Sequence, residues 1–295
     1  MDAWLADFME REGLPPAFAE TVNRIAQPLC DLICQRAQGP GYLVGLCGAQ
    51  GSGKSTLVAV LAHALHLRGL SVATLSLDDL YLTRAERQAL ARTVHPLFAT
   101  RGVPGTHDVA LGLRTLEALG GNGSVSLPSF DKALDDRRPA SQGQLIQAPV
   151  DVILFEGWCM GARPQASEAL LMPVNDLERD EDPNGVWRRR VNAELAGPYQ
   201  SLFSRIDLFV LLEAPDFSVV EAWRGSQEDR LRERLGSAAS GRAMSGPELA
   251  RFIAHYERLT RHILAEAPAR ADVRIRLDRA RNPTWISPPL GGDAR

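Results

Sequence analysis

The chain has 295 residues, of which 45 % are hydrophobic and 23 % charged, with a formal net charge of −3. These values are ordinary for a folded globular protein, and the small negative charge gives no reason to expect a nucleic-acid partner. The chain has no apolar run near the ~20 residues that span a bilayer and no basic, apolar leader, so we expect a cytoplasmic protein without a membrane partner.

From residue 42 onward, short apolar strands alternate with amphipathic helices. Strands that are apolar throughout are typical of a mostly parallel sheet with helices on both faces. Two capping boxes, Thr83 with Glu86 and Ser245 with Glu248, mark helix starts. The expected strands cover residues 42–47, 71–77, 124–127, 150–155, 206–212 and 272–277. The expected helices cover residues 16–37, 55–68, 83–93, 108–119, 184–204, 215–235 and 245–263.

This alternation predicts an α/β fold of three layers, with one domain over residues 1–295. Loops and helices are expected to be inserted between the strands. We expect residues 1–40 to form a helical lead-in and residues from about 224 to 246 to form a lid. Residues 282–295 are a Pro/Gly-rich tail that we expect to be ordered only where it docks on the domain.

Residues 48–55 read GAQGSGKS and fit the pattern G-x-x-x-x-G-K-[ST] between a predicted strand and a predicted helix. Glycines let backbone N–H groups turn around phosphate oxygens, and the helix N-terminus adds its positive dipole end. We expect Lys54 to reach the outer phosphates of ATP and the Ser55 hydroxyl to ligate Mg²⁺. The sequence therefore predicts a P-loop NTPase fold. The expected nucleotide contacts are Gly48, Gln50, Gly51, Ser52, Gly53, Lys54, Ser55 and Thr56.

An acidic residue at the end of a neighbouring strand would complete the nucleotide site. Glu156 follows the apolar run VDVILF and has this position. We expect its carboxylate to hold Mg²⁺ or the water shell of the ion, together with Ser55. The predicted cofactors are ATP and Mg²⁺.

A P-loop alone does not distinguish a kinase from a switch or a motor. A GTPase would carry the guanine-reading motif N-K-x-D, which the two lysines of the chain, Lys54 and Lys132, do not form. A kinase needs a carboxylate that faces the γ-phosphate, and Asp78 at the end of the strand 71–77 is placed to take the proton of an acceptor hydroxyl. Asp79 is the alternative base, and either carboxylate could instead cap the following turn. A regulatory ATPase that uses the nucleotide as a switch remains the competing class.

Several stretches in a fixed order resemble the D-glycerate 3-kinase family of bacteria, fungi and plants. They are LDDLYLT (77–83), HPLFATRGVPGTHD (95–108), LPSFDKALDDR (127–137), FEGWCMGARP (155–164), LERDEDPNGVWRRRVN (177–192) and HYERLTRHIL (255–264). This family is related to uridine kinase, pantothenate kinase and phosphoribulokinase. The resemblance implies phosphoryl transfer from ATP to D-glycerate, which gives 3-phospho-D-glycerate and ADP. A sibling kinase that acts on uridine, pantothenate or a sugar phosphate is the alternative.

Glycerate is a carboxylate, so its pocket beside ATP needs fixed cations and hydrogen-bond donors. Arg101, Lys132 and Arg137 are candidates to hold the carboxylate, and Asp131 is a candidate to hold a hydroxyl. Each of these loop charges could instead be a surface charge, and Asp108 is equally suited to cap a helix. The expected substrate-binding residues are Asp78, Tyr81, Arg101, His107, Asp131, Lys132 and Arg137.

The segment 223–232 is basic and precedes a loop of small residues. In kinases of this type a lid closes over the phosphates, excludes water and supplies arginines, and Arg224 and Arg230 are the candidates here. A solvated helix face with i,i+4 ion pairs is the alternative. The charge-dense run 177–190 is expected to be a solvated face. We expect a small-molecule partner and a monomer or a weak homo-oligomer.

Overall fold

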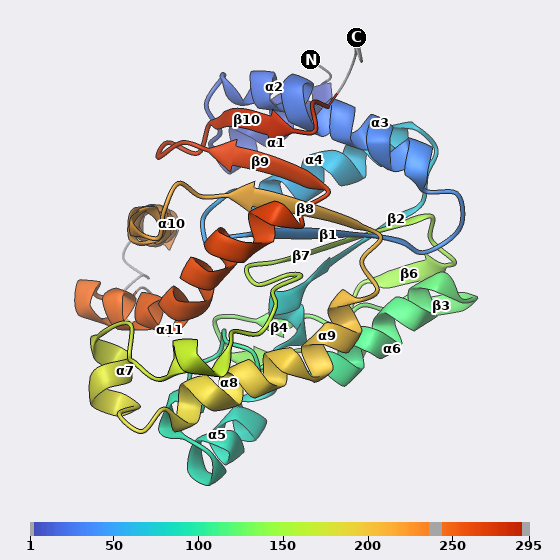
Figure 1. The fold of residues 1–295 in the computed structure, drawn as a ribbon. Helices are drawn as coiled ribbons and strands as arrows, with labels where there is room; N and C mark the ends of the chain where they lie inside the picture. The colour runs from blue at the N-terminus through green and yellow to red at the C-terminus, as the bar shows by residue number, and fades with distance from the viewer. Residues whose placement is uncertain (1–2, 236–243, 291–295) are drawn as a thin grey trace.

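The protein, as a computed structural model, is described over residues 3–235 and 244–290 (Figure 1), with the side chains of 227–235 left out. Its centre is a six-stranded sheet of order β10-β9-β8-β1-β7-β2. Five strands are parallel, and β10 runs antiparallel to β9 at one edge. The strands are β1 (Tyr42–Gly48), β2 (Val72–Ser76), β7 (Val152–Gly157), β8 (Leu208–Glu213), β9 (Val273–Leu277) and β10 (Pro283–Ser287).

Helices cover both faces of the sheet, as the apolar strands predict (Figure 1). Side chains alternate along each strand, so β1 sends Val44 and Leu46 into one core and Leu43 and Cys47 into the other. The first core lies under α1 (Ala3–Glu12), α3 (Gln27–Arg36), α4 (Lys54–Leu67) and α10 (Ser218–Leu235). The second lies under α6 (Val109–Gly120), α8 (Val186–Ala196), α9 (Pro198–Phe203) and α11 (Gly246–Glu266).

Two helix predictions need correction in detail. The helix expected over 16–37 consists of α2 (Phe18–Thr21), a π-helical turn (Val22–Ala26) and α3. The helix expected over 184–204 is two helices, because Gly197 and Pro198 interrupt it and the proline begins α9 where no N–H is needed. α5 (Arg84–Thr93) and α11 begin at the predicted capping boxes.

The tail contains a strand, which its Pro and Gly content did not predict. Pro283 begins β10 at the sheet edge, a position at which proline is tolerated because no ladder donor is lost. Trp285 of β10 lies against the guanidinium groups of Arg274 and Arg276 on β9, at 5.3 and 5.2 Å from its ring centroid. These contacts hold β10 against β9.

The prediction of a solvated face over 177–190 was wrong for three of its charged residues. Glu178 in α7 (Asp176–Glu181), Asp182 after it and Arg188 in α8 are 1 %, 1 % and 3 % exposed. Arg188 pairs with Asp182 at 3.0 Å, and Glu178 pairs with Arg258 of α11 at 2.6 Å. These three charges are buried because each meets a partner, and that of Glu178 lies 80 residues away, whereas Arg179, Asp180 and Arg190 of the same run are exposed as predicted.

Residues 121–149 form an insertion of two small hairpins. β3 (Gly123–Ser126) pairs with β6 (Leu145–Ala148), and β4 (Phe130–Asp131) pairs with β5 (Asp136–Arg137). The second hairpin packs on the 3-10 turn Leu77–Leu80 that follows β2. It is therefore held beside the end of a central strand, where the predicted catalytic carboxylate lies.

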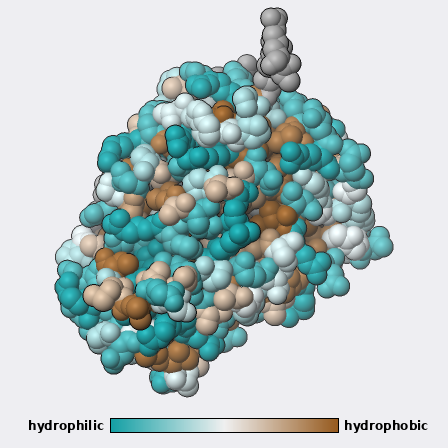
Figure 2. All heavy atoms as spheres, viewed as in Figure 1, coloured by the Kyte–Doolittle hydropathy of each residue, from teal (hydrophilic) through white to brown (hydrophobic). Residues whose placement is uncertain are grey.

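The surface in Figure 2 is mixed, with hydrophobic residues in small areas among hydrophilic ones. Within residues 3–235 and 244–290, no helix is both long enough and apolar enough to cross a membrane.

Candidate active site

The P-loop joins β1 to α4 at the carboxyl edge of the sheet. Gly51 and Gly53 have φ of +78° and +92°, a left-handed conformation that favours glycine. A Cβ on Gly51 would lie 2.8 Å from the Cβ of Trp223 in α10, and one on Gly48 would lie 2.7 Å from Ser52 Oγ. The loop is therefore packed so closely that glycine is required for its shape.

The interior of the loop suits phosphate oxygens. Lys54 is 8 % exposed, and its Nζ donates to the carbonyl of Ala49 at 3.1 Å. The side-chain amide of Gln50 and the hydroxyl of Ser52 are buried without a hydrogen-bond partner in the described part of the chain. Because an unpartnered buried polar group is costly, these donors and the positive end of α4 fit an anionic ligand.

Glu156 joins the P-loop to β2. Its Oε1 accepts hydrogen bonds from Ser55 Oγ at 2.8 Å and from Ser76 Oγ at 3.2 Å. Strand β7 lies between β1 and β2, so the ends of three adjacent parallel strands meet here. A carboxylate beside a hydroxyl supplies the hard oxygen ligands that Mg²⁺ prefers. The predicted pair of Ser55 and Glu156 thus fits the ion.

Ser76 was not predicted as a site residue. Its hydroxyl donates to Glu156 and also accepts the backbone N–H of Asp78 at 3.2 Å. It therefore connects the two carboxylates and fixes the turn that carries Asp78. Ser76 is the last residue of β2, two positions before Asp78, and a hydroxyl at this strand end could have indicated a site residue.

Asp78 is held between two donors. Lys132 Nζ lies 2.6 Å from Asp78 Oδ2, and the Tyr81 hydroxyl donates to Oδ1 at 2.9 Å. Burial alone would raise the pKa of Asp78, but the Lys132 ammonium and the Tyr81 hydroxyl lower it to about 2. The structure thus brings together three residues that the sequence placed in the acceptor site.

Asp79 differs from its neighbour. Its Oδ1 accepts the backbone N–H of Phe130 at 3.2 Å, which ties the second hairpin to the turn. Burial raises the pKa of Asp79 from 3.8 to about 6, and the charges of Asp78 and Glu156 act in the same direction. The Phe130 N–H lowers the pKa in part.

This raised pKa makes the charge of Asp79 a cost to stability. A carboxyl whose folded pKa exceeds its unfolded pKa stabilises the protein below about pH 4, and this contribution is lost as the pH rises through about 6. Asp79→Asn should therefore raise the free energy of unfolding at pH 7.5 by on the order of 2 kcal/mol. The gain should fall to about 1 kcal/mol at pH 4.5, because that pH lies only slightly above the unfolded pKa of 3.8. Urea denaturation at both pH values measures this, and an unchanged or lower stability at pH 7.5 would contradict it.

His107 and Tyr81 form an aromatic wall behind Asp78. Their rings stack with centroids 4.5 Å apart, and burial lowers the pKa of His107 to about 3, so the imidazole is neutral. The Tyr199 hydroxyl accepts the N–H of Gly105 at 3.0 Å and lies 2.5 Å from His107 Nδ1. This contact is a hydrogen bond between the two side chains, and it fixes the imidazole ring against Tyr199. His107 Nε2 is buried without a partner in the described residues.

Three other predicted substrate residues are engaged in holding the loops. Arg137 donates to the carbonyl of Tyr81 at 2.9 Å and to Asp108 at 3.2 Å, while Asp108 caps α6. Asp131 accepts two backbone N–H groups of its own turn and pairs with Arg138 at 2.7 Å. Arg101 pairs with Asp135. Their roles in acceptor binding stay predictions.

Arg87 and Asp135 were missed by the sequence analysis. Arg87 is 1 % exposed, pairs with Asp135 at 2.8 Å and donates to the carbonyl of Ala99. Asp135 has φ of +56°, which a non-glycine residue adopts rarely, and it meets both Arg87 and Arg101. The two residues anchor the hairpin that carries Lys132. Nothing in the local pattern at residue 87 indicates a buried arginine.

The predicted lid is described only in part. Arg224 lies over the ring of Phe252, 5.8 Å from its centroid. The side chain of Arg230 and residues 236–243 lie outside the described part of the chain.

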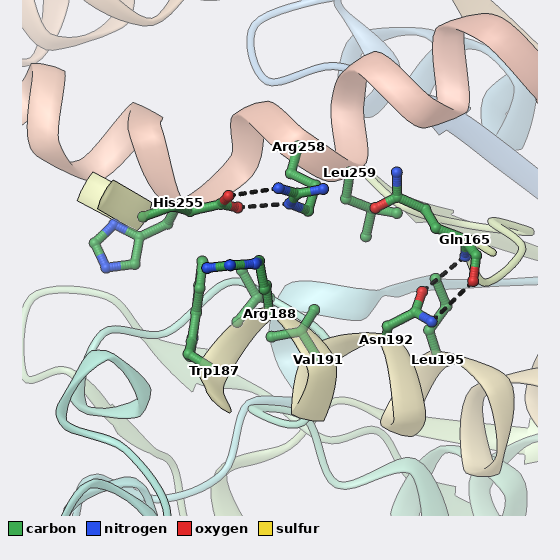
Figure 3. A pocket seen from close by; sticks show the side chains of 11 residues that line it. Gln165, Trp187, Arg188, Val191, Asn192, Leu195, His255, Arg258 and Leu259 are labelled. Atoms are coloured by element: carbon green, nitrogen blue, oxygen red, sulfur yellow. Dashed lines mark hydrogen bonds and ion pairs between the residues drawn. The ribbon is translucent and has the colours of Figure 1, made fainter. Parts of the chain in front are cut away.

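A separate small cavity lies between α8 and α11 (Figure 3). Arg188 on α8 lies opposite Arg258 on α11, and His255 lies near them. The guanidinium groups already bond to Asp182, Glu178 and backbone carbonyls of residues 169–172. None of the lining residues belongs to the P-loop. This cavity is therefore part of the structural framework.

With this geometry in place, the comparisons with known proteins decide the family. A model of the KAP family P-loop domain matches residues 22–238. This chain belongs to that family. The P-loop domain is also 36 % identical over 231 residues to an uncharacterized kinase of Schizosaccharomyces pombe, across 75 % of this chain and 80 % of the relative.

Two further relatives of this P-loop domain are D-glycerate 3-kinases. The chloroplastic enzyme of Arabidopsis thaliana is 32 % identical over 259 residues, which cover 83 % of this chain but only 54 % of the plant protein. The solved structure of the enzyme from Cryptococcus neoformans var. grubii matches with a TM-score of 0.73 at 25 % identity, over 90 % of this chain and 98 % of that chain. The predicted resemblance and the α/β fold are confirmed, and the chain is a P-loop kinase.

Proposed function

We propose that this kinase transfers the γ-phosphoryl group of ATP to D-glycerate, giving 3-phospho-D-glycerate and ADP. The observation that carries the proposal is the contact between Asp78 and Lys132 at the end of β2, beside the P-loop. It provides a carboxylate for the acceptor hydroxyl and an ammonium for the acceptor carboxylate at one place. The named activity of two relatives supports the choice of glycerate. A cytoplasmic location and a monomeric or weakly associated state stay predictions.

The P-loop residues hold the nucleotide in this proposal. Backbone N–H groups from Gly48 to Thr56 surround the phosphates, and Lys54 contacts the outer ones. Ser55 and Glu156 would hold Mg²⁺, which neutralises phosphate charge when bound. Burial of Lys54 strengthens its attraction to the transferred group because water screens it less.

Asp78 acts on the acceptor hydroxyl. As the hydroxyl oxygen forms its bond to the γ-phosphorus, the bond from phosphorus to the β,γ-bridging oxygen breaks and its electron pair leaves with ADP. The hydroxyl proton passes to the Asp78 carboxylate and then to solvent. Tyr81 and Ser76 hold the carboxylate in place through the bonds described above.

An acceptor panel tests the proposal. The purified protein is given ATP and Mg²⁺, and ADP release is measured without an acceptor and with D-glycerate, L-glycerate, uridine, pantothenate or ribulose 5-phosphate. We expect a large stimulation by D-glycerate alone. Stimulation by another alcohol instead would overturn the substrate, and slow ATP turnover that no acceptor changes would favour a regulatory ATPase.

A further inference from the structure

The contact between Lys132 and Asp78 also bears on how the enzyme selects its acceptor, an inference that rests on the proposed function. Lys132 belongs to the hairpin of β4 and β5, and its side chain is 61 % exposed although its Nζ lies 2.6 Å from a partly buried carboxylate. An ammonium has three N–H donors. The Lys132 ammonium can therefore reach a ligand in solvent while the backbone of Lys132 is fixed by the turn.

The hairpin is anchored independently of Lys132. Asp79 accepts the N–H of Phe130, Asp136 accepts the N–H of Arg84 at 3.1 Å, and Arg87 holds Asp135. These bonds keep the backbone of Lys132 in place whether or not its ammonium contacts Asp78. The side chain alone can move, since it is long and exposed.

The paired state is unfavourable for proton transfer. Both oxygens of Asp78 accept a hydrogen bond, one from Lys132 and one from Tyr81. Lys132 is the strongest of the groups that hold the pKa of Asp78 down, so its departure makes the carboxylate a stronger base. The charged or titratable groups that interact with Asp78 include Lys132, Tyr81, His107 and Asp79, and the buried Tyr256 and Cys159, whose pKa values the charge of Asp78 helps to raise.

We propose that Lys132 masks Asp78 until the carboxylate of the acceptor draws its ammonium away, so that an anionic acceptor activates the base that receives its proton. A neutral alcohol of the same size leaves Asp78 paired. Discrimination between the two acceptors then arises in turnover and not only in binding. The chemical class selected is a small hydroxy acid.

The comparison of D-glycerate with glycerol tests this mechanism, because glycerol has the hydroxyls without the charge. In the unaltered enzyme we expect kcat for D-glycerate to exceed kcat for glycerol by at least ~10²-fold. In Lys132→Met the KM for D-glycerate should rise about tenfold or more, and kcat for glycerol should increase several-fold, because Asp78 is no longer masked. A lysine that only bound the carboxylate would not raise turnover of glycerol.

Arg138→Met is the matched control. It removes a cation of the same hairpin, one that pairs with Asp131 and not with Asp78, and should leave the ratio of the two kcat values unchanged. Lys132→Gln repeats the test with a polar side chain if the Met variant melts at a lower temperature. Glycerol turnover that stays level or falls in both Lys132 variants would overturn the inference. A lack of glycerate phosphorylation by the unaltered enzyme would instead overturn the proposed function.

Discussion

Asp78→Asn should lower the turnover number by at least ~10²-fold while leaving ATP binding intact. Asparagine keeps the size of the side chain, and its Oδ1 can still accept the hydrogen bond from Tyr81 that Asp78 accepts at 2.9 Å. It cannot take a proton from the acceptor hydroxyl. Lys54 and the loop glycines are untouched, so the dissociation constant for ATP should change little. Steady-state turnover and calorimetric ATP titration measure the two effects.

Asp79→Asn is the control for this assignment. Asp79 is bound to the hairpin through Phe130, so its amide should keep that contact and most of the turnover. Near-normal turnover in Asp78→Asn, with a large loss in Asp79→Asn, would move the base to Asp79. Near-normal turnover in both variants would show that neither carboxylate acts as the base.

Arg258→Ala should lower the free energy of unfolding by about 3–5 kcal/mol, the effect expected when one partner of a buried ion pair is removed. The Glu178 carboxylate would remain buried without its cation. The carbonyls of Ala169 and Met172 would also lose their donors, and α11 would keep only its more exposed ion pair to α7, that of Arg251 with Glu181. Urea denaturation followed by circular dichroism measures the loss.

Arg261→Ala is a matched control on the same helix. Arg261 is 59 % exposed and pairs with Glu257 one turn away, so its removal should cost less than about 1 kcal/mol. A loss below 1 kcal/mol for Arg258→Ala, equal to that of the control, would show that the buried pair does not stabilise the link between α7 and α11.

Local pattern was sufficient for most of the sheet and for the P-loop. The strands β1, β7 and β8 are continuous or nearly continuous apolar runs, and a run of this kind in an α/β chain has few alternatives. β9 instead alternates Val, Ile and Leu with arginine, which is the period of a strand. Capping boxes such as that of Thr83 are complete within four residues, so the sequence shows them directly. Contacts between residues that are far apart in the sequence could not be predicted in this way. The partner of Glu178 lies 80 residues away, and β10 is a strand because β9 offers it an edge.

In the candidate site, too, some residues could be predicted from local pattern and others depend on tertiary structure. Asp78 and Glu156 follow from their places at strand ends, which topology brings together. The roles of Arg101 and Arg137 depend on how the insertion folds, and their charge alone did not show that Asp135 and the Tyr81 carbonyl would occupy them. The contact of Lys132 with Asp78 is likewise set by a hairpin whose turn contains a residue with positive φ.

The most direct measurement is phosphorus NMR of the reaction of the purified protein with ATP, Mg²⁺ and D-glycerate. The proposed D-glycerate 3-kinase activity predicts one new phosphomonoester signal that coincides with added 3-phospho-D-glycerate and grows as the γ-phosphate signal of ATP declines. A signal that coincides with added 2-phospho-D-glycerate, or free phosphate as the only product, would contradict it.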